Sequence, residues 1–353
     1  MSKKLTTFSI ILILIFAIAT PGLSAASPGS DYASPELIDP EAHAAEDSEE
    51  TDGKVNDPYD LTGRVIILDP GHGIGSTNIF EGYDEQVAML DLAHRIKPLL
   101  KARGATVRMT RYTGENVLLP VRAAMVNIWA LEAILEARLK EEVENGAIPE
   151  GLTDLAEIGC KELSAYITEI KDLIAIMQKI IEDPHEYGTI YMNTPFNPKR
   201  GIHPDLQRIL ELQNHPVIAD QFLFISLHSN ATPRPIDTNI NGAKAFHISN
   251  EHRNTRNYFT GFSHSAQSRQ FGVILLSYTE TIGFQNLGPK IGNFFVIREH
   301  NVPAVLTENG FHTNARDRAM LMDTEFMDKL AAAYLYAITE YFSSISHMDG
   351  VVS

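Results

Sequence analysis

Two histidines and two glutamates have the residue types and positions that hydrolytic metal chemistry requires: His72, Glu85, His228 and Glu308. Three of them follow short apolar, β-branched runs that are typical of buried strands, and Glu85 opens a stretch with helical spacing. Catalytic zinc sites use three protein ligands and leave one position open for water. A further carboxylate must then take the proton of that water. These four residues therefore predict a zinc site with a general base, although they lie far apart in the sequence.

Each of these residues also has an ordinary structural interpretation. A histidine at a strand end is often a turn residue bonded to a carbonyl group. Glu308 could cap a helix, and Glu85 could be a favourable charge at a helix N-terminus. The glycines around His72 could form a phosphate loop. However, the stretch GHGIGS (71–76) lacks the Lys-Ser/Thr pair of a P-loop, which argues against that alternative.

The elements around these residues alternate between strands and helices. This order predicts one α/β domain over 63–345, with three layers around a mixed β-sheet flanked by helices. The site is expected at the carboxyl ends of the strands, where open α/β sheets place their sites. We expect strands at 64–69, 105–110, 222–227, 242–248 and 303–307, and helices at 85–103, from 121 to 127, at 265–282 and at 324–342.

A long insertion, about 128–216, interrupts this pattern. Its first part has helical spacing up to Glu144, and its second part repeats apolar residues in steps of four and three from Leu163 to Ile181. These two parts predict an antiparallel helical hairpin, and a short helix is expected at 205–213. The loop 191–200 is rich in aromatic, amide and basic groups, which suit a sugar-peptide ligand. The insertion could form a wall of a substrate groove, or it could be a docked structural arm or a hairpin that binds a protein regulator.

The N-terminal residues predict export. Residues 1–26 have two lysines, an apolar run of about a dozen residues and small residues for cleavage, which is the pattern of a signal peptide. An uncleaved membrane anchor is the alternative, and both place the rest outside the cytoplasm. Residues 27–62 are predicted to be a disordered acidic linker, since eleven acids stand against one base between Asp31 and Asp60. Residues 346–353 are expected to be a tail.

Composition limits the remaining possibilities. The net charge is −16 and no basic stripe exists, so nucleic acid is not an expected partner. Cys160 is the only cysteine, which excludes an internal disulfide and favours a small buried apolar residue. The chain is expected to be a monomer.

Five strings in order give a specific resemblance: VIILDPGHG (65–73), EQVAMLDLA (85–93), RAAMVN (122–127), ISLHSNA (225–231) and PAVLTENGF (303–311). Together they resemble the zinc-dependent N-acetylmuramoyl-L-alanine amidases of the type-3 catalytic domain, over roughly 63–127 and 217–345. The resemblance implies that His72, Glu85 and His228 bind Zn²⁺ and that Glu308 is the catalytic acid/base. It also implies that Arg298 lies near the peptide substrate, where it could hold a carboxylate of the stem peptide; an ordinary salt bridge is the alternative interpretation of this arginine.

The implied reaction is hydrolysis of the amide bond between N-acetylmuramic acid and L-alanine in peptidoglycan. A zinc peptidase that cuts within the stem peptide and a non-catalytic wall-binding module are the alternatives. The chain departs from the family pattern at Gln86, Met89 and Asn309, where the family usually has Lys, Asn and an aliphatic residue. Asn309 is close enough to Glu308 to affect substrate choice, and Asn230 is a further candidate for substrate contact.

Overall fold

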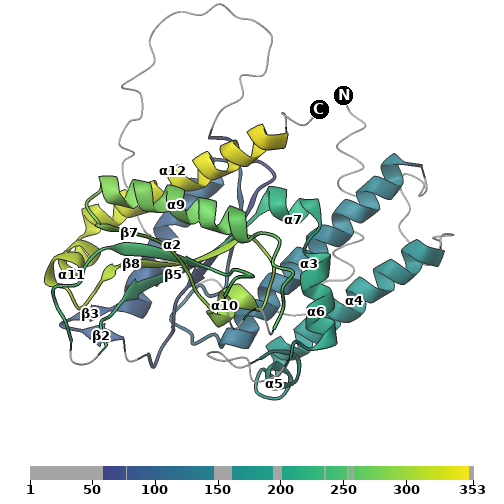
Figure 1. Ribbon diagram of the computed structural model, residues 1–353, viewed down its shortest axis with the longest axis horizontal. Coiled ribbons are helices and arrows are strands. Elements are labelled where there is room, and N and C mark those ends of the chain that lie inside the picture. Colours follow the sequence, from purple (N-terminus) through teal and green to yellow (C-terminus); the bar gives the residue numbers. More distant parts are fainter. Residues whose placement is uncertain are drawn as a thin grey trace, which may run out of the picture.

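Apolar, β-branched runs become the strands of one mixed sheet in the computed structural model, which describes residues 59–76, 78–146, 161–193, 201–233, 236–252, 255 and 258–349 (Figure 1). The sheet order is β4-β1-β5-β8-β6-β7. β1, β4, β5 and β8 are parallel, β6 is antiparallel to β8, and β7 is parallel to β6. The strands are β1 (Val65–Pro70), β4 (Thr106–Met109), β5 (Phe222–Asn230), β6 (Ala243–His247), β7 (Asn286–Ile291) and β8 (Ala304–Phe311).

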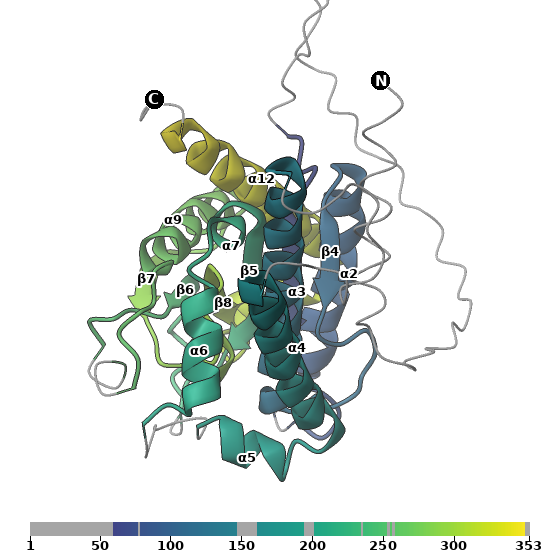
Figure 2. The same ribbon diagram turned by 90° about the vertical axis from the view of Figure 1, so that its right-hand side faces the viewer.

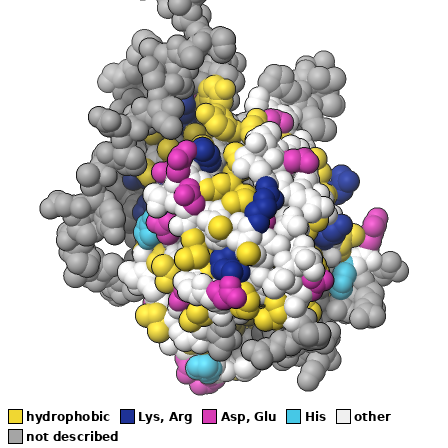
Figure 3. Space-filling model, turned by 90° about the vertical axis from the view of Figure 1, so that its left-hand side faces the viewer, with side chains coloured by type: hydrophobic (Ala, Val, Ile, Leu, Met, Phe, Trp, Pro, Cys, Tyr) yellow, Lys and Arg dark blue, Asp and Glu magenta, His cyan; other side chains and the backbone are white. Residues whose placement is uncertain are grey.

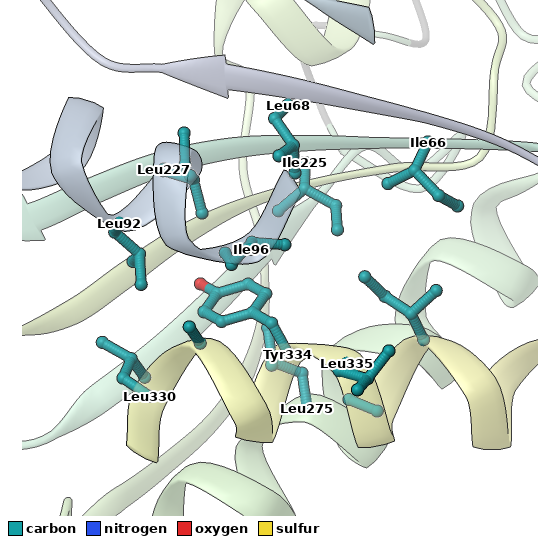
Figure 4. Packing of buried hydrophobic residues seen from close by; sticks show 14 of the residues in the cluster. Ile66, Leu68, Leu92, Ile96, Ile225, Leu227, Leu275, Leu330, Tyr334 and Leu335 are labelled. Carbon is teal, nitrogen blue, oxygen red and sulfur yellow. The ribbon is translucent and has the colours of Figure 1, made fainter. Parts of the chain in front are cut away.

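Helices cover both faces of this sheet because side chains alternate along each strand. Ile66 and Leu68 of β1 pack in a core with α2 (Glu85–Ala102), α9 (Ser265–Thr281) and α12 (Thr324–Asp349). Figure 4 shows Tyr334 of α12 in this core, next to Ile96 and Leu275. Ile67 packs on the opposite face, with residues of α3 (Leu119–Glu144), α7 (Pro216–Gln221) and α10 (Phe295–Arg298). The predicted three-layer α/β fold is confirmed.

The predicted helical hairpin is formed by α3 and α4 (Lys161–Glu182). Asn127, in the first half of α3, lies 3.7 Å from the sulfur of Met177 near the end of α4, so the two helices run antiparallel. Figure 2 shows α3, α4 and α6 (Pro204–Leu212) grouped beside the sheet. They share an apolar core of their own, which includes Leu131, Leu135, Leu139, Leu163, Ile167, Ile170, Ile174, Met177, Leu206 and Ile209.

The structure differs from the sequence prediction at the start of this insertion. No break occurs at residue 128, because α3 has two apolar faces. Val126, Ala130 and Ile134 pack towards the sheet, while Leu131 and Leu135 pack towards α4. The first helix of the insertion therefore also belongs to the α/β layers.

Several short elements were not predicted. A hairpin of β2 (Ile79–Phe80) and β3 (Tyr83–Asp84) leads into α2. β7 contains Gly288 and Pro289, residues that are not typical of strands, so the sequence pattern did not predict it. Both residues are tolerated because β7 is an edge strand. The remaining helices are α5 (Tyr187–Tyr191) and α11 (Ala315–Met322).

Some predictions fall on residues outside the described ranges. These are the signal peptide 1–26, the acidic linker up to residue 58, Cys160, and residues 194–200 of the aromatic loop. α12 continues to Asp349, past the predicted domain end at 345. Among the helices that the structure describes, none is both long enough and apolar enough to cross a membrane.

Candidate metal centre

Strand register brings two of the predicted site residues side by side. His228 of β5 is paired with Glu308 of β8 in the parallel ladder. His72 follows β1, which pairs with β5 on its other side, and Glu85 is the first residue of α2. The four residues therefore meet at the carboxyl ends of neighbouring parallel strands, which is the edge that the sequence indicated.

Three of these side chains form a compact cluster. Nδ1 of His228 lies 3.1 Å from Nε2 of His72 and 3.0 Å from Oε1 of Glu85. Nε2 of His72 lies 3.2 Å from the same Glu85 oxygen. The side chains of His72 and His228 are 29% and 18% exposed, whereas that of Glu85 is 1% exposed. The glutamate of the cluster is thus buried in the protein, and the two histidines face solvent.

The cluster has the size of a zinc site. Zinc–ligand bonds of about 2.0–2.1 Å at tetrahedral angles would separate ligand atoms by roughly 3.4 Å, close to the distances found. Two imidazole nitrogens and a carboxylate oxygen are also the donor set of many zinc hydrolases. Such acceptor atoms repel one another at this distance unless a proton or a cation lies between them. The residues present therefore fit a zinc ion.

The glycines beside His72 serve close packing. A Cβ atom on Gly71 would lie 2.4–2.6 Å from ring atoms of His228, and one on Gly73 would lie 2.4 Å from the carbonyl oxygen of Glu115. The sharp turn itself is made by His72, whose φ of 60° is uncommon for a residue with a side chain. Gly71 thus allows the two histidines to meet, and Gly73 allows the loop to pack against Glu115. The surrounding structure must hold the strained turn.

Two buried arginines hold that turn. Arg122 donates to the carbonyl oxygens of Pro70 (2.7 Å) and His72, and Arg111 donates to those of Pro70 (2.9 Å) and Gly71 (2.8 Å). Three successive carbonyl groups of the loop are therefore fixed by two guanidinium groups. Both arginines are almost fully buried, so this support is part of the core.

Asp69 is the counter-charge of this loop. Its carboxylate accepts hydrogen bonds from Thr110 (2.5 Å), Ser226 (2.6 Å) and Arg122 (2.6 Å). Burial alone would raise the pKa of Asp69, but the charge of Arg122 and these hydrogen bonds outweigh burial and lower it. The group is therefore ionised at neutral pH and pairs with Arg122 beneath the cluster.

Each of the two carboxylate oxygens of Glu85 accepts a hydrogen bond from a different residue. Oε1, which faces the histidines, accepts from the backbone N–H of Ser229 (3.0 Å), and Oε2 accepts from Nδ2 of Asn78 (2.7 Å). Burial would raise the pKa of Glu85, but hydrogen bonds and charge interactions with His228 and His72 lower it overall. The carboxylate is therefore ionised and presents one oxygen to the cluster.

Glu308 has a different environment. Its Oε2 is buried and has no hydrogen-bond partner among the described residues. Burial, together with the charge of Glu85, raises the pKa of Glu308 to about 8, and the charge of Lys244 opposes part of this rise. A carboxyl group with a pKa near neutrality and a free oxygen can both accept and return a proton.

The sequence profile of the N-acetylmuramoyl-L-alanine amidases matches residues 66–137 and 190–340, more than half of the 353 residues. The chain belongs to this amidase family. All four central residues lie inside the matched ranges. The part left out, 138–189, lies within the predicted insertion and contains the end of α3 and all of α4.

Individual relatives are distant. An uncharacterized cell wall amidase of Bacillus anthracis is 29% identical over 125 residues, which are 35% of this amidase chain and 22% of that protein. The N-acetylmuramoyl-L-alanine amidase LytC of Bacillus subtilis is 27% identical over 158 residues, 43% of this chain and 29% of LytC. The alignments thus span less than a third of either relative. The solved catalytic domain of CwlV from Bacillus (Paenibacillus) polymyxa has 18% identity and a TM-score of 0.42, and the match covers 79% of this chain and 97% of that one.

The residues predicted to contact substrate lie in three different environments. Arg298 is fully buried and forms an ion pair of 2.6 Å with Glu299, which is the ordinary salt bridge that the sequence left open as the alternative to substrate contact. Asn309 is also buried. It follows Glu308 in β8, so alternation along the strand places it on the opposite face of the sheet. Asn230 is half-buried two residues after His228, and it remains a candidate for substrate contact.

Asn309 has a structural role on that opposite face. Its Nδ2 donates to the carbonyl oxygen of His228 (3.0 Å), and its Oδ1 accepts from the hydroxyl of Tyr334 (2.9 Å). The departure from the aliphatic residue usual in the family is therefore accommodated by hydrogen bonds within the core. Asn309 supports the backbone of a cluster residue and lies away from the open side.

Sequence reasoning missed the residues that support the cluster from behind. Asn78 lies in a short loop without a motif, and Ser229 contributes its backbone N–H to Glu85. The hydroxyl of Ser229 lies between the Tyr83 hydroxyl (2.8 Å) and Nδ1 of His312 (3.0 Å), and the two rings stack. Burial raises the pKa of Tyr83 and lowers that of His312, so both are neutral. Only the histidine, at the end of β8, could have been noticed as a polar residue at a strand end.

Proposed function

We propose that this chain is a zinc-dependent amidase that hydrolyses the bond between N-acetylmuramic acid and the L-alanine of the stem peptide in peptidoglycan. The observation that carries the proposal is the triangle of His72, Glu85 and His228 with Glu308 in the next strand. Family membership supports the substrate class. A scaffold that only bound the wall would have no need of this set.

The roles of the residues follow from their environments. When bound, zinc polarises the scissile carbonyl and makes a water molecule more acidic. Glu308 accepts the proton of the attacking water and passes it to the leaving amine. Part of the raised pKa of Glu308 comes from the charge of Glu85. Ligation of Glu85 to a cation removes that part and favours the ionised Glu308 that a base requires.

We further propose that the protein acts outside the cytoplasm, in the periplasm or cell wall, after export through residues 1–26. The substrate is the peptidoglycan of the envelope, and the similar protein of Bacillus anthracis is a cell wall amidase by name. Basic and acidic side chains are interspersed on the face in Figure 3, unlike the basic stripe of a nucleic-acid-binding protein. A monomer, and a protein regulator bound by the insertion, stay predictions.

Digestion of purified peptidoglycan by the zinc-loaded protein, followed by mass spectrometry of the products, tests the proposed reaction. Amidase activity releases peptides that begin with L-alanine and leaves a free lactyl group on muramic acid. Fragments cut within the stem peptide would replace the amidase by a peptidase. The Glu308→Gln variant is the matched control for contaminating hydrolases. Binding to peptidoglycan without any product, in both proteins, would leave a wall-binding module.

A further inference from the structure

Lys244 is a cation beside the centre to which the proposed reaction gives no role. The antiparallel register of β6 and β8 places it directly opposite Glu308. Because β5 and β8 are in register at His228 and Glu308, these three residues form one row across three neighbouring strands. Residues that oppose one another in adjacent strands point to the same face of a sheet. Lys244 therefore stands on the face that carries His228 and Glu308.

The ammonium group of Lys244 has aromatic neighbours, and the charge that acts on it from the next strand is that of Glu308. Its Nζ lies 4.9 Å from the ring centre of Phe311 and 5.5 Å from that of Phe246. Among the described residues it makes no hydrogen bond or ion pair, and the side chain is half-buried. The two rings hold the cation in place by cation–π attraction and leave its N–H groups without an acceptor among the described residues. Such a group is available to an anionic ligand.

The charges around the centre favour an anion at this position. With zinc bound, the charge of the metal is balanced by the carboxylates of Glu85 and Glu308. Arg298, the other cation considered for substrate contact, is already neutralised by Glu299. Arg111 and Arg122 are almost fully buried and bind carbonyl groups of the His72 loop. Lys244 is therefore the half-buried cation on the face that carries His228 and Glu308.

The spacing suits a group on the peptide side of the scissile bond. Adjacent strands lie about 4.8 Å apart, so the backbone of Lys244 is about 10 Å from that of His228. One extended peptide residue spans at most about 3.5 Å. A peptide whose scissile carbonyl lies at the cluster therefore reaches Lys244 within its first two or three residues.

We propose that Lys244 binds a carboxylate of the stem peptide and makes the enzyme select peptides in which that carboxylate is free over peptides in which it is amidated. This proposal rests on the proposed amidase function. A carboxylate forms a charge-assisted hydrogen bond with the ammonium group, whereas a carboxamide offers only a neutral acceptor.

The test uses two synthetic N-acetylmuramoyl peptides that differ only at the second peptide residue, which carries either a free carboxylate or a carboxamide. KM and kcat are measured for the zinc-loaded wild-type chain and for Lys244→Met, Lys244→Arg and Lys101→Met. Lys101 is an exposed lysine in the last turn of α2, about 24 Å along the helix from Glu85. Its replacement changes the net charge by the same amount as Lys244→Met but leaves the surroundings of the centre unaltered.

The wild type should show a KM that is about 10- to 100-fold lower for the carboxylate peptide, as expected for a hydrogen bond to a charged group. Lys244→Met should lose this preference, with the KM for the carboxamide peptide and the zinc content unchanged. Lys244→Arg and Lys101→Met should keep the preference. Thermal melting establishes that each variant is folded.

Three results would overturn the proposal. One is a wild type that cuts both peptides equally well, and another is a Lys244→Met variant with the wild-type preference. The third is an equal loss on both peptides together with a shifted pH–rate profile, which would mean that Lys244 acts through Glu308. In each case the amidase function would stand. A wild type that cuts neither peptide would instead overturn the proposed function, and the role of Lys244 with it.

Discussion

Asn78 donates a hydrogen bond of 2.7 Å from its Nδ2 to Oε2 of Glu85, and the same nitrogen lies 3.1 Å from Nε2 of His72. The carboxylate can only accept, so the amide nitrogen must face it. One side chain thereby holds two predicted zinc ligands in place and reserves one oxygen of Glu85 for the cluster. Asn78 is therefore expected to organise the centre before a metal binds.

Replacement of Asn78 by alanine should weaken zinc binding by about 10- to 100-fold, the usual cost of removing a group that orients a metal ligand. Competition with a chromophoric chelator measures this affinity directly. Asn286→Ala is the matched control, because Asn286 makes the same kind of contact, to Glu280 at 3.4 Å, on the surface. Equal affinities in wild type and Asn78→Ala would mean that Glu85 is positioned by Ser229 alone.

Glu308→Gln should lower kcat by about 10²–10⁴-fold or more, because the variant cannot take a proton from water. Its zinc content should match that of the wild type, since Glu308 is outside the ligand triangle. Metal analysis by atomic absorption, on the same samples used for the kinetics, checks both points. A metal-free variant would move Glu308 into the ligand set and reopen the role of Glu85.

His72→Ala and His228→Ala should each empty the zinc site and leave the fold intact. The α/β core is large and does not depend on a metal, unlike that of a zinc finger. Metal content and far-ultraviolet circular dichroism separate the two effects. His94→Ala, at an exposed histidine of α2 that contacts the Tyr112 carbonyl, should retain full zinc. Full zinc and activity in both cluster variants would exclude the proposed metal site.

The stability of the metal-free protein should carry a pH dependence from Glu308. Its pKa rises from 4.5 in the unfolded chain to about 8 in the folded protein, so folding favours the protonated form. The stability that this gives is present below pH 4.5 and is lost as the pH rises through about 8. Glu308→Gln removes the titration. The melting temperature of this variant should match wild type near pH 4.5 and exceed it increasingly towards pH 8.5. A constant difference across that range would contradict the raised pKa.

Arg122→Met should destabilise the protein by about 3–5 kcal/mol, because it leaves the carboxylate of Asp69 buried without its partner. Urea unfolding gives the free energy. Arg138→Met, in the same helix, removes an arginine that is 43% exposed and pairs with Glu142. That change should cost less than about 1 kcal/mol. Similar losses in the two variants would show that the buried pair is not what stabilises the loop.

The sequence indicated the central residues because each stands at an element boundary that local patterns reveal. His72, His228 and Glu308 follow or end apolar runs that form strands. The parallel register of these strands then brings the three side chains together at one edge of the sheet. The sequence also allows a prediction of the sheet face on which Asn309 lies. A residue next to Glu308 in a strand must point the other way, and the substrate role predicted for it ignored that alternation.

Other features depend on contacts that no local pattern encodes. The sequence left Arg298 open between a substrate contact and a salt bridge, because the choice depends on residues that are distant in the chain. Glu299 pairs with it, and Tyr258 donates to the same carboxylate from a separate loop at 2.6 Å. Asn78 could not be found because its partners are set by the turn between β1 and α2. The strand β7 escaped because an edge strand tolerates residues that a central strand excludes.

The continuity of α3 also determines how the insertion can behave mechanically. Between Val121 and Glu144 the helix contains neither proline nor glycine, the residues at which helices usually kink. Its first half packs on the sheet, since Val126, Ala130 and Ile134 share a core with Ile67 of β1 and Phe224 of β5. Asn127 also donates to the carbonyl oxygen of Glu299, which follows α10, at 2.9 Å. The hairpin is therefore joined to the sheet by one continuous helix, with no proline or glycine between Val121 and Glu144 to act as a hinge. We therefore expect the hairpin to move with the sheet as one body, so that its distance from His72 and His228 stays constant.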